Sequence, residues 1–424
     1  MLYCPWRNAG MANDTISREA KKNQLRRQII SSEELKKNKD YQRRRKQQRF
    51  QNWMAVLGAV LIVAAVILGI YLFETFRTYK TFRVEWEKDV IGAESSQFVR
   101  LGNGTVQLGA DGATYFSDGG ETLWSVPYEM RSPQGAVQDA YMIIYDKKGQ
   151  SLIICDTQGE RGRSSTSYAI TSADISSQGV AVVLTEEKES SYISYFDSSA
   201  GRLEIEIKSP LESQGYPAAI SISPDGQQLM VSYLSVSGGA VSSQVVFYDF
   251  EEGKDVPNRV VGAFQNYKET DTMVPFVAYM SNQAGVAVGD NMISFYSTED
   301  RTDIQQKNVP ITEPIQKVFC DETYLGLVTA KTTEDGATVP MLYLYSAEGV
   351  CLLQKELTDQ MEHVFLNSSK IVMYEASSCL IQTVKGRMRY DNSFETAITA
   401  MLPGGSQREY IVVSDDKIEK VRLQ

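Results

Sequence analysis

Histidine and cysteine are scarce in this sequence, whose 424 residues include one histidine and five cysteines. A serine hydrolase triad or an imidazole-based zinc site would have to use that histidine, His363, which stands among apolar residues in QMEHVFL. We expect His363 to be a partly buried packing side chain in a strand. No two cysteines have the C-x-x-C spacing of many metal and redox sites. The sequence predicts no catalytic residue, no cofactor and no metal site.

Four of the cysteines fall in or beside apolar runs: Cys155, Cys320, Cys351 and Cys379. Free cysteine behaves as a small apolar side chain in such surroundings, so we expect buried thiols, with one disulfide as the alternative. A calcium loop of the form D-x-D-x-D-G is also missing. The Asp-Gly pairs of the sequence are typical of tight hairpin turns, and weak cation binding by some of them is the alternative.

Charged residues, side-chain amides and proline are all missing from Met54–Phe73. At about 1.5 Å per residue, a helix over this run would cross the roughly 30 Å apolar core of a bilayer. Trp53, Tyr71 and Phe73 stand at its two ends, where membrane helices carry interfacial aromatic residues. A buried soluble helix and a cleaved export signal are the alternatives, but a signal has a shorter apolar core. The sequence predicts a permanent transmembrane helix over residues 53–73.

Acidic residues are few in the segment before this run. Residues 1–53 hold 14 Lys and Arg against 5 Asp and Glu, whereas residues 54–424 hold 29 against 48. Since Lys and Arg gather on the cytoplasmic side of membrane helices, we expect residues 1–52 to be a cytoplasmic tail and the residues from about 77 onward to lie outside. The residues expected to set this topology, or to bind anionic lipid, are Lys36, Lys37, Lys39, Arg43, Arg44, Arg45, Lys46 and Arg49. Nucleic acid or an acidic cytosolic partner is the competing ligand of the tail.

Helix-forming residues dominate residues 17–50 of this tail, which lack proline and glycine. Ser31 and Glu34 have the spacing of a capping box, which predicts a second helix that starts near Ser32. Met11 is an alternative start of translation.

Long helical patterns are missing after residue 95, where short Val-, Ile- and Tyr-rich runs alternate with turns rich in Gly, Asp, Asn and Ser. One unit recurs there, in which a short apolar strand is followed by a polar turn and a second strand. It begins at Ala113, Ser151, Tyr192, Val245, Met292, Leu342, Leu380 and Tyr410. Its spacing of 30–53 residues brackets the roughly 40 to 50 residues of a four-stranded propeller blade.

Continuous apolar runs separate these units, for example AYMIIYD from Ala140 and GVAVVLTE from Gly179. They predict strands buried on both faces, as the inner strands between neighbouring blades are. We therefore expect residues 95–424 to form an all-β propeller of about eight four-stranded blades, or of seven if the last short unit completes the first blade. A β-sandwich array is the other alternative, and residues 74–94 are expected to be a linker.

Two stretches resemble known propeller repeats. ISISPDGQQLMVSY, from Ile220 to Tyr233, is similar to the repeat of TolB-type propellers, and DGGETLWSV, from Asp118, is similar to a turn of quinoprotein-type propellers. The whole layout resembles an uncharacterised family of single-pass membrane proteins of Gram-positive bacteria with an extracytoplasmic propeller. These resemblances imply a fold and carry no activity.

Taken together, these features predict a binding or scaffold module at the cell surface. Its partners would be the lipid bilayer around the helix and a protein, peptide or cell-wall component held by the propeller. The acidic balance of the outer part disfavours nucleic acid as an outer ligand. The alternatives are a propeller enzyme of the lyase or quinoprotein-like type and a signalling anchor that couples outside binding to the basic tail.

Overall fold

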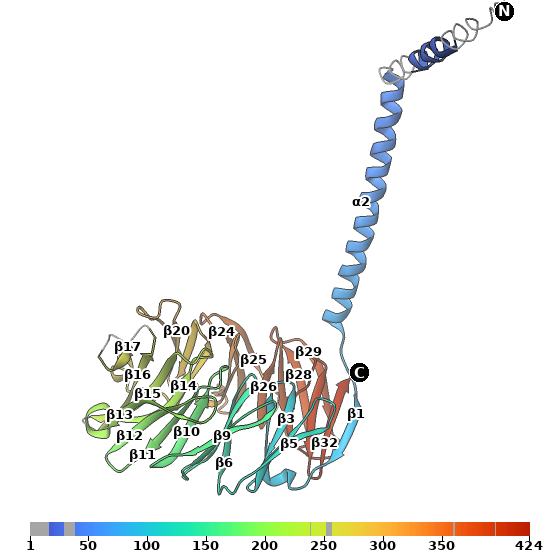
Figure 1. Cartoon of the computed structure of the whole chain (residues 1–424). Helices are drawn as coiled ribbons and strands as arrows, with labels where there is room; N and C mark the ends of the chain where they lie inside the picture. Colours follow the sequence, from blue (N-terminus) through green and yellow to red (C-terminus); the bar gives the residue numbers. More distant parts are fainter. Residues whose placement is uncertain (1–16, 29–38, 238, 252–256, 359–360, 395) are drawn as a thin grey trace, which may run out of the picture. The chain divides into compact units, whose positions relative to one another are not determined.

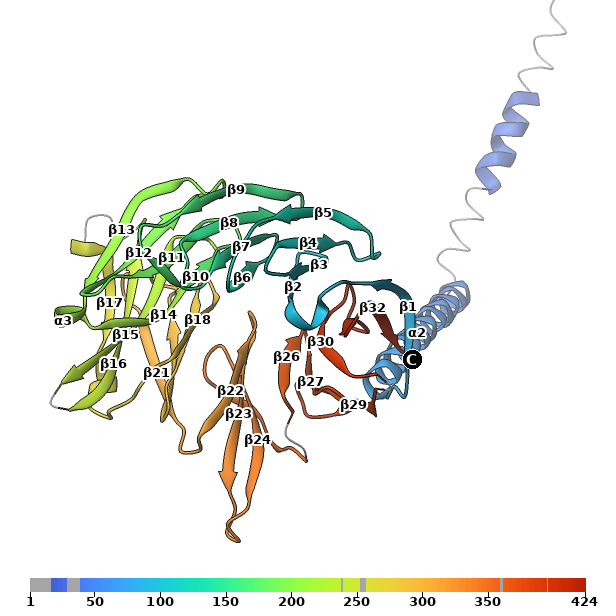
Figure 2. The same ribbon diagram turned by 90° about the horizontal axis from the view of Figure 1, so that it is seen from below.

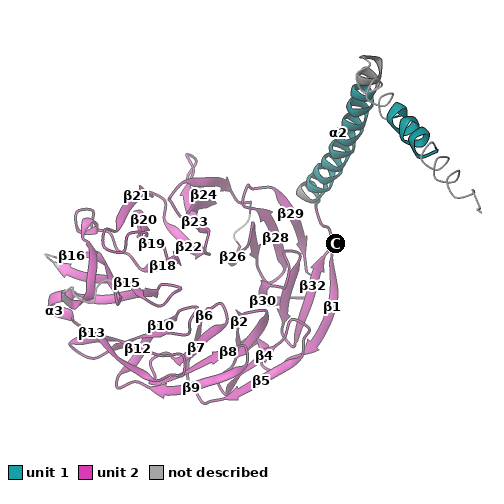
Figure 3. Cartoon of the chain, turned by 45° about the horizontal axis from the view of Figure 1, so that its top comes forward, with its two compact units in different colours: residues 1–77 teal, residues 78–424 magenta. Residues whose placement is uncertain are grey.

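The chain was analysed as a computed structural model, which describes residues 17–28, 39–237, 239–251, 257–358, 361–394 and 396–424. It divides into two compact units, residues 1–77 and residues 78–424 (Figure 3). Met11 and the helix start expected near Ser32 lie outside the described residues.

The first unit is helical. Residues 17–28 form one helix, and α2 (Lys39–Phe76) is a second (Figure 1). Within α2, Arg45–Phe73 is long and apolar enough to cross a membrane, and none of that window is buried. The helix expected over residues 53–73 is therefore present, but it begins earlier, because the Lys, Arg and Gln residues before the apolar run are good helix formers.

The second unit is a ring of eight antiparallel four-stranded sheets, the blades of a β-propeller (Figures 2 and 3). Blade 1 consists of β2 (Gln97–Leu101), β3 (Gly104–Leu108), β4 (Gly112–Phe116) and β5 (Thr122–Pro127). Blade 2 consists of β6 (Pro133–Gln138), β7 (Tyr141–Asp146), β8 (Ser151–Asp156) and β9 (Gly159–Ser165). Blade 3 consists of β10 (Ala169–Ile175), β11 (Ala181–Glu186), β12 (Ser190–Phe196) and β13 (Arg202–Pro210). Blade 4 consists of β14 (Tyr216–Ile222), β15 (Gln228–Ser237), β16 (Ala240–Asp249) and β17 (Val260–Phe264).

The remaining blades follow the same order. Blade 5 consists of β18 (Phe276–Ser281), β19 (Ala284–Val288), β20 (Met292–Ser297) and β21 (Gln305–Pro310). Blade 6 consists of β22 (Ile315–Cys320), β23 (Tyr324–Thr332), β24 (Thr338–Ser346) and β25 (Cys351–Glu356), and blade 7 of β26 (His363–Asn367), β27 (Lys370–Tyr374), β28 (Ser378–Thr383) and β29 (Met388–Ser393). Blade 8 combines β30 (Ile398–Pro403), β31 (Glu409–Ser414) and β32 (Lys417–Leu423) with β1 (Phe82–Asp89). Short helical turns lie at η1 (Ala93–Ser95), α3 (Leu211–Gln214), η3 (Pro257–Arg259) and η4 (Asn266–Lys268).

The ring closes because β1 pairs with β32 as the fourth strand of blade 8. The expected count of eight blades is confirmed, but the expected linker over residues 74–94 is wrong over residues 82–89. The last unit supplies only three strands, and the strand that completes it stands more than 300 residues earlier, where no repeat marks it. Trp86 of this strand donates from Nε1 to the carbonyl of Asp118 in blade 1 over 2.9 Å. The turn after Asp118 passes close to the Trp86 ring at Gly120, where φ is +82° and a Cβ would lie 2.8 Å from the ring.

The core consists of eight apolar clusters, each between two neighbouring blades. Successive side chains of a strand point to opposite faces of its sheet, so the second strands can fill the clusters on both sides of a blade. In β7, for example, Ile144 packs toward blade 1 and Ile143 packs toward blade 3, and both are fully buried. The continuous apolar runs of the sequence are these second strands.

The two faces of the ring differ in their connections. We call the closure face the side on which β1 begins and β32 ends; the turns between first and second strands and between third and fourth strands lie there. The opposite face carries the turns between second and third strands. Two hairpins are longer on that side: β15 and β16 have 10 residues each, and β23 and β24 have 9 each. Their counterparts in the other blades have 5 to 7 residues, so blade 5 lies between two raised ribbons.

Candidate binding cleft between the fifth and sixth blades

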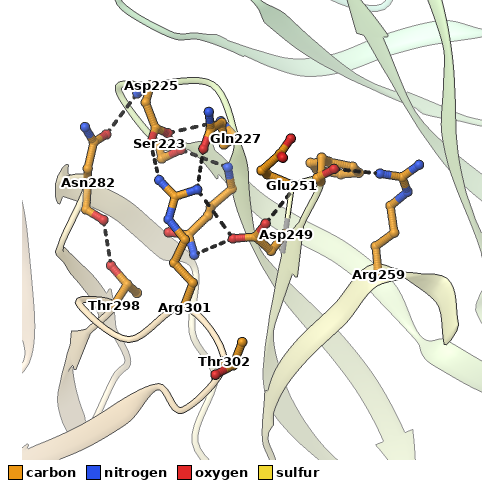
Figure 4. Close-up of polar contacts among 12 residues, drawn as sticks. Ser223, Asp225, Gln227, Asp249, Glu251, Arg259, Asn282, Thr298, Arg301 and Thr302 are labelled. Carbon is orange, nitrogen blue, oxygen red and sulfur yellow. Dashed lines mark hydrogen bonds and ion pairs between the residues drawn. The ribbon is translucent and has the colours of Figure 1, made fainter. Parts of the chain in front are cut away.

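Blades 4 and 5 are held together by a polar cluster around Arg301 (Figure 4). Arg301, in the turn between β20 and β21, binds the Asp225 carboxylate and the amide oxygen of Gln227. Its Nη1 also lies 3.8 Å from Oδ2 of Asp249, whose side chain is fully buried. The backbone N–H of Asp225 in turn donates to Oδ1 of Asn282 in blade 5 over 2.9 Å. The SPDG turn found in the sequence thus supplies Asp225, one of the two carboxylates that hold Arg301 of the neighbouring blade.

The inner strands of blades 3, 4 and 5 are joined by further hydrogen bonds. The N–H of Ile222 donates to Oδ2 of Asp174 over 2.9 Å, which joins blade 4 to blade 3. The N–H of Tyr279 donates to the hydroxyl of Ser221 over 3.0 Å, which joins blade 5 to blade 4. These bonds hold three consecutive inner strands in register along the central channel.

The junction between blades 5 and 6 has fewer hydrogen bonds across it than the junction between blades 4 and 5. Within the described residues, one hydrogen bond crosses it, from Nζ of Lys307 to the carbonyl of Glu348 over 2.9 Å. The two blades otherwise meet through an apolar cluster that includes Phe295, Leu325 and Tyr345. A junction held by packing with little polar bonding is where a solvent-accessible cleft costs least, since few buried polar groups lose partners when it opens.

Three cavities lie in series along this junction, and we refer to them together as the junction cleft. A cavity of 560 Å³ opens on the closure face, one of 390 Å³ borders the central channel, and one of 510 Å³ opens on the opposite face. Glu322 lines both the first and the second cavity, and Phe276 lines both the second and the third. Neighbouring cavities thus share a lining residue, and the series extends from one face of the ring to the other.

Carboxylates dominate the charge of the first two cavities. The cavity on the closure face is lined by the aromatic residues Phe295 and Tyr296 and by Glu299, Glu322, Glu348 and Lys307. The channel cavity adds Asp174 and Asp321. These carboxylates outnumber the one lysine, so the charge that the two cavities present is negative.

Asp174 is the most perturbed of these carboxyl groups. Burial raises the pKa of Asp174 from 3.8 to about 6, and hydrogen bonds from the backbone N–H groups of Ile222 and Ile175 hold the pKa below what burial alone would give. Its charge therefore changes near physiological pH. Burial also raises the pKa of the nearby Cys320 thiol to about 12, which keeps this thiol protonated and unreactive.

The third cavity is apolar. Its lining includes Pro275, Phe276 and Val288 of blade 5 and Pro314, Ile315 and Val318 at the start of blade 6. Lys317 also lines it, and Nζ of Lys317 donates to the carbonyl of Glu362 over 2.5 Å. An aromatic side chain and two prolines offer a rigid apolar surface, which suits contact with apolar side chains.

The histidine and the cysteines that the sequence singled out lie in different surroundings. His363 begins β26 and is exposed, with its ring stacked on Tyr374 at 4.7 Å; the expectation of a partly buried histidine is wrong, because the residue stands at a strand end. Cys155 and Cys379 are buried and Cys320 is partly buried, but Cys351 is exposed, since it begins the outer strand β25. These four thiols are free. Among the described residues, no group of three or more His, Cys, Asp and Glu is placed to hold a metal ion.

The predicted tail and interface residues lie in the first unit. Arg45, Lys46 and Arg49 are exposed on α2, and so are Trp53, Tyr71 and Phe73, each more than 60% exposed. Lys39, Arg43 and Arg44 belong to the first turns of α2, and Lys36 and Lys37 lie outside the described residues. Their roles in topology, in lipid binding and at the membrane interface stay predictions.

A family model of a family of unknown function, DUF5711, matches residues 75–423. The chain belongs to this family. The matched region contains the whole propeller of this chain, from β1 to β32. A comparison with curated protein sequences found no match.

Solved structures show the same architecture at low identity. Sqt1 from Chaetomium thermophilum has a TM-score of 0.54 at 10% identity, and the match covers 81% of this chain and 100% of that one. A second structure, Sqt1 bound to the N-terminus of the ribosomal protein L10, has a TM-score of 0.51 at 10% identity over 79% and 98% of the two chains. BamB from Moraxella catarrhalis has a TM-score of 0.50 at 10% identity over 81% and 100%. At this identity the likeness of these proteins to the DUF5711 chain concerns the fold alone.

The residues of the junction cleft were missed in the sequence. Asp174, Phe276 and Glu322 stand in three different blades, in inner strands or their turns, and no motif surrounds them. The inner strands β10, β14 and β18 carry residues that bond to the preceding blade, whereas β22 does not do so in the described residues, and no local pattern in the sequence marks this difference.

Proposed function

We propose that this chain is a membrane-anchored binding module, whose propeller lies outside the cytoplasmic membrane and holds a segment of a partner protein in the junction cleft. The observation that carries the proposal is the series of three neighbouring cavities along a blade junction that, in the described residues, has a single hydrogen bond across it. Ligand sites in proteins are concave, largely pre-formed and usually of about 300 to 1,000 Å³, and each of these cavities falls in that range.

The anchor is supported by α2 and by the charge around it. Its window Arg45–Phe73 meets the length and apolarity of a membrane span, and basic residues precede it. The lipid-facing role of Trp53, Tyr71 and Phe73 and the cytoplasmic placement of the basic tail are part of the same proposal.

A protein partner is favoured over a cell-wall component by the form of the site. A series of three neighbouring cavities, apolar at one end and charged at the other, offers separate places for the side chains of a peptide. Among solved propellers of similar fold, Sqt1 is bound to the N-terminus of the ribosomal protein L10, so a ring of this architecture can hold a peptide segment.

Site-specific photocrosslinking in native membranes tests the proposal. A photoreactive residue at Thr323, in the exposed β22–β23 turn that lines the closure-face cavity, should form an adduct with a protein partner. The control position is Ser369, which is exposed in the corresponding β26–β27 turn of blade 7. Adducts of equal yield at both positions, or none at Thr323, would contradict binding in the cleft.

A further inference from the structure

We infer that the segment held in the junction cleft is an extended peptide with basic side chains at one end and apolar side chains at the other. This inference rests on the proposed function and names the chemistry of its partner. The basic end would lie at the closure face and channel, and the apolar end would lie at the opposite face, between the two raised ribbons.

The order of the cavities fixes this polarity. Five carboxylate side chains line the first two cavities, namely Asp174, Glu299, Asp321, Glu322 and Glu348, against the single ammonium of Lys307. The ammonium of Lys307 acts on the carboxylate of Glu348, which leaves the other four carboxylates of these cavities without a cation among the lining residues. Complementary charge steers partners and excludes wrong ones, so a basic segment is favoured at this end and an acidic one is repelled.

The lining of the third cavity suits the apolar end of the segment. Pro275, Phe276, Pro314 and Ile315 form an apolar lining at which a charged side chain would lose hydration without gaining a partner. Asp290 is the one carboxylate of this lining, and its Oδ1 already accepts from the N–H of Met273 over 3.1 Å. Apolar residues, including proline, are therefore the chemistry that this end takes.

A free strand edge beside the third cavity favours an extended backbone. The pairing of β22 with β23 ends at Ile315 and Thr329, whereas β23 continues to Thr332 in its pairing with β24. In the described residues, Lys331 and Thr332 thus have a strand on one side only. An extended peptide that leaves the apolar cavity can add to such an edge through main-chain hydrogen bonds.

The surroundings of blade 5 on the opposite face carry the same charge bias. The exposed acidic residues there are Glu269, Asp271, Asp290, Glu334 and Asp335, and the exposed basic ones are Lys268 and Lys331. The whole second unit holds 28 Lys and Arg against 47 Asp and Glu. A basic partner is therefore attracted to both mouths of the junction cleft, and the apolar lining of the third cavity is what sets the direction of the segment.

The test uses the full chain in nanodiscs of zwitterionic lipid, so that no anionic lipid competes for a basic ligand. The probe is a short fluorescent peptide with a run of lysines followed by leucines and prolines, and the matched probe has glutamines in place of the lysines. We expect the lysine probe to bind more tightly than the glutamine probe, by an amount that shrinks as salt is added.

Variants of this chain locate the binding. Glu322→Gln and Glu348→Gln should each raise the Kd of the lysine probe by roughly threefold to tenfold, and the double variant should raise it further. Glu121→Gln is the control, because Glu121 is exposed in the β4–β5 turn of blade 1, away from the junction. Ile315→Ser, at the apolar end, should weaken both probes equally, and the thermal midpoint of each variant shows that the ring is intact.

The inference is overturned if the two probes bind equally or if the cleft variants bind the lysine probe as the Glu121→Gln control does. Its failure is distinguishable from failure of the proposed function. If the Thr323 photoadduct forms and its captured segment is acidic or wholly polar, the cleft is a binding site for a different peptide chemistry. If no photoadduct forms at all, the proposed function itself has failed.

Discussion

The ammonium of Lys420 lies 2.5 Å from Oδ2 of Asp118, which joins the last blade of the ring to the first. The same ammonium lies 3.1 Å from Oε2 of Glu409, and the side chains of Lys420 and Glu409 are each less than 10% exposed. Lys420 therefore neutralises carboxylates on both sides of the closure. The ion cluster therefore acts together with the pairing of β1 with β32 and the apolar cluster between blades 8 and 1 to close the ring.

Replacing Lys420 should weaken the ring more than replacing an exposed lysine on the same strand. Lys420→Met removes the cation from Asp118 and one of the two cations from the buried Glu409, which keeps Arg422, and we expect a loss of roughly 1 to 3 kcal/mol in the free energy of unfolding. Lys417→Met is the matched control: Lys417 lies 3.7 Å from Glu87, both are more than a third exposed, and a loss below about 0.5 kcal/mol is expected. Chemical unfolding of both variants checks this, and equal losses would contradict the role of the closure.

The two junctions of blade 5 should respond differently to loss of their cations. Arg301→Met removes the guanidinium from Asp225 and from the buried Asp249. We expect this to lower the free energy of unfolding by roughly 1 to 3 kcal/mol. Lys307→Met removes the one hydrogen bond between blades 5 and 6, from an exposed side chain, and should cost less than about 1 kcal/mol. Thermal unfolding of the two variants compares them directly; a larger effect of Lys307→Met would mean that the junction cleft is more tightly tied than the contacts show.

The raised pKa of Asp174 predicts how stability changes with pH. Since burial raises the pKa of this carboxyl to about 6, its contribution to stability is fully present below about pH 4 and is lost as the pH rises through 6. The unfolding free energy of Asp174→Asn, compared with that of the natural chain, should therefore improve by roughly 2 kcal/mol between pH 4 and pH 7.

Asp197 is the matched control for this pH profile. Hydrogen bonds from the Ser199 hydroxyl and from the backbone of Gly201 lower its pKa. Its contribution to stability is present above about pH 4 and is lost as the pH falls, so Asp197→Asn should show a profile of the opposite sign. Denaturant titrations from pH 3 to pH 7 measure both; profiles of the same sign would refute the assignment at Asp174.

Cys351 provides a test of the membrane topology. Its thiol is exposed at the start of β25, and Cys4 stands in the basic tail on the other side of the apolar helix. A membrane-impermeant maleimide added to intact cells should label Cys351 and leave Cys4 unlabelled until the membrane is opened. The variants Cys351→Ser and Cys4→Ser assign the signals. Labelling of Cys4 alone in intact cells would reverse the proposed orientation.

The propeller could be predicted from the sequence because each hairpin repeats the same local chemistry. The third and fourth strands, with a polar turn between them, are recognisable at Ser151 and Leu342 as well as at Tyr410, where the same pattern forms the second and third strands of blade 8. A continuous apolar run marks the second strands because they are buried on both sides. Strand β1 was missed because it stands alone, without its partner strands beside it in the sequence.

The junction cleft could not be predicted because it depends on contacts between distant residues. Arg301 binds Asp225 and Gln227 across more than 70 residues, and no local pattern shows that the next junction has no such cluster. The predicted burial of His363 and of Cys351 was wrong for a related reason. Each residue begins a strand, where apolar neighbours in the sequence do not ensure apolar neighbours in space.

Hydrogen–deuterium exchange of the full chain, with and without the partner captured from its native membrane, tests the central claim most directly. Binding in the junction cleft predicts slower exchange in the segments that line it, at residues 297–307, 315–323 and 346–348, because their N–H groups become covered. The corresponding turns of blade 7, at residues 368–369 and 384–387, should exchange at an unchanged rate. Protection confined to blade 7, or spread equally over all eight blades, would contradict the cleft as the binding site.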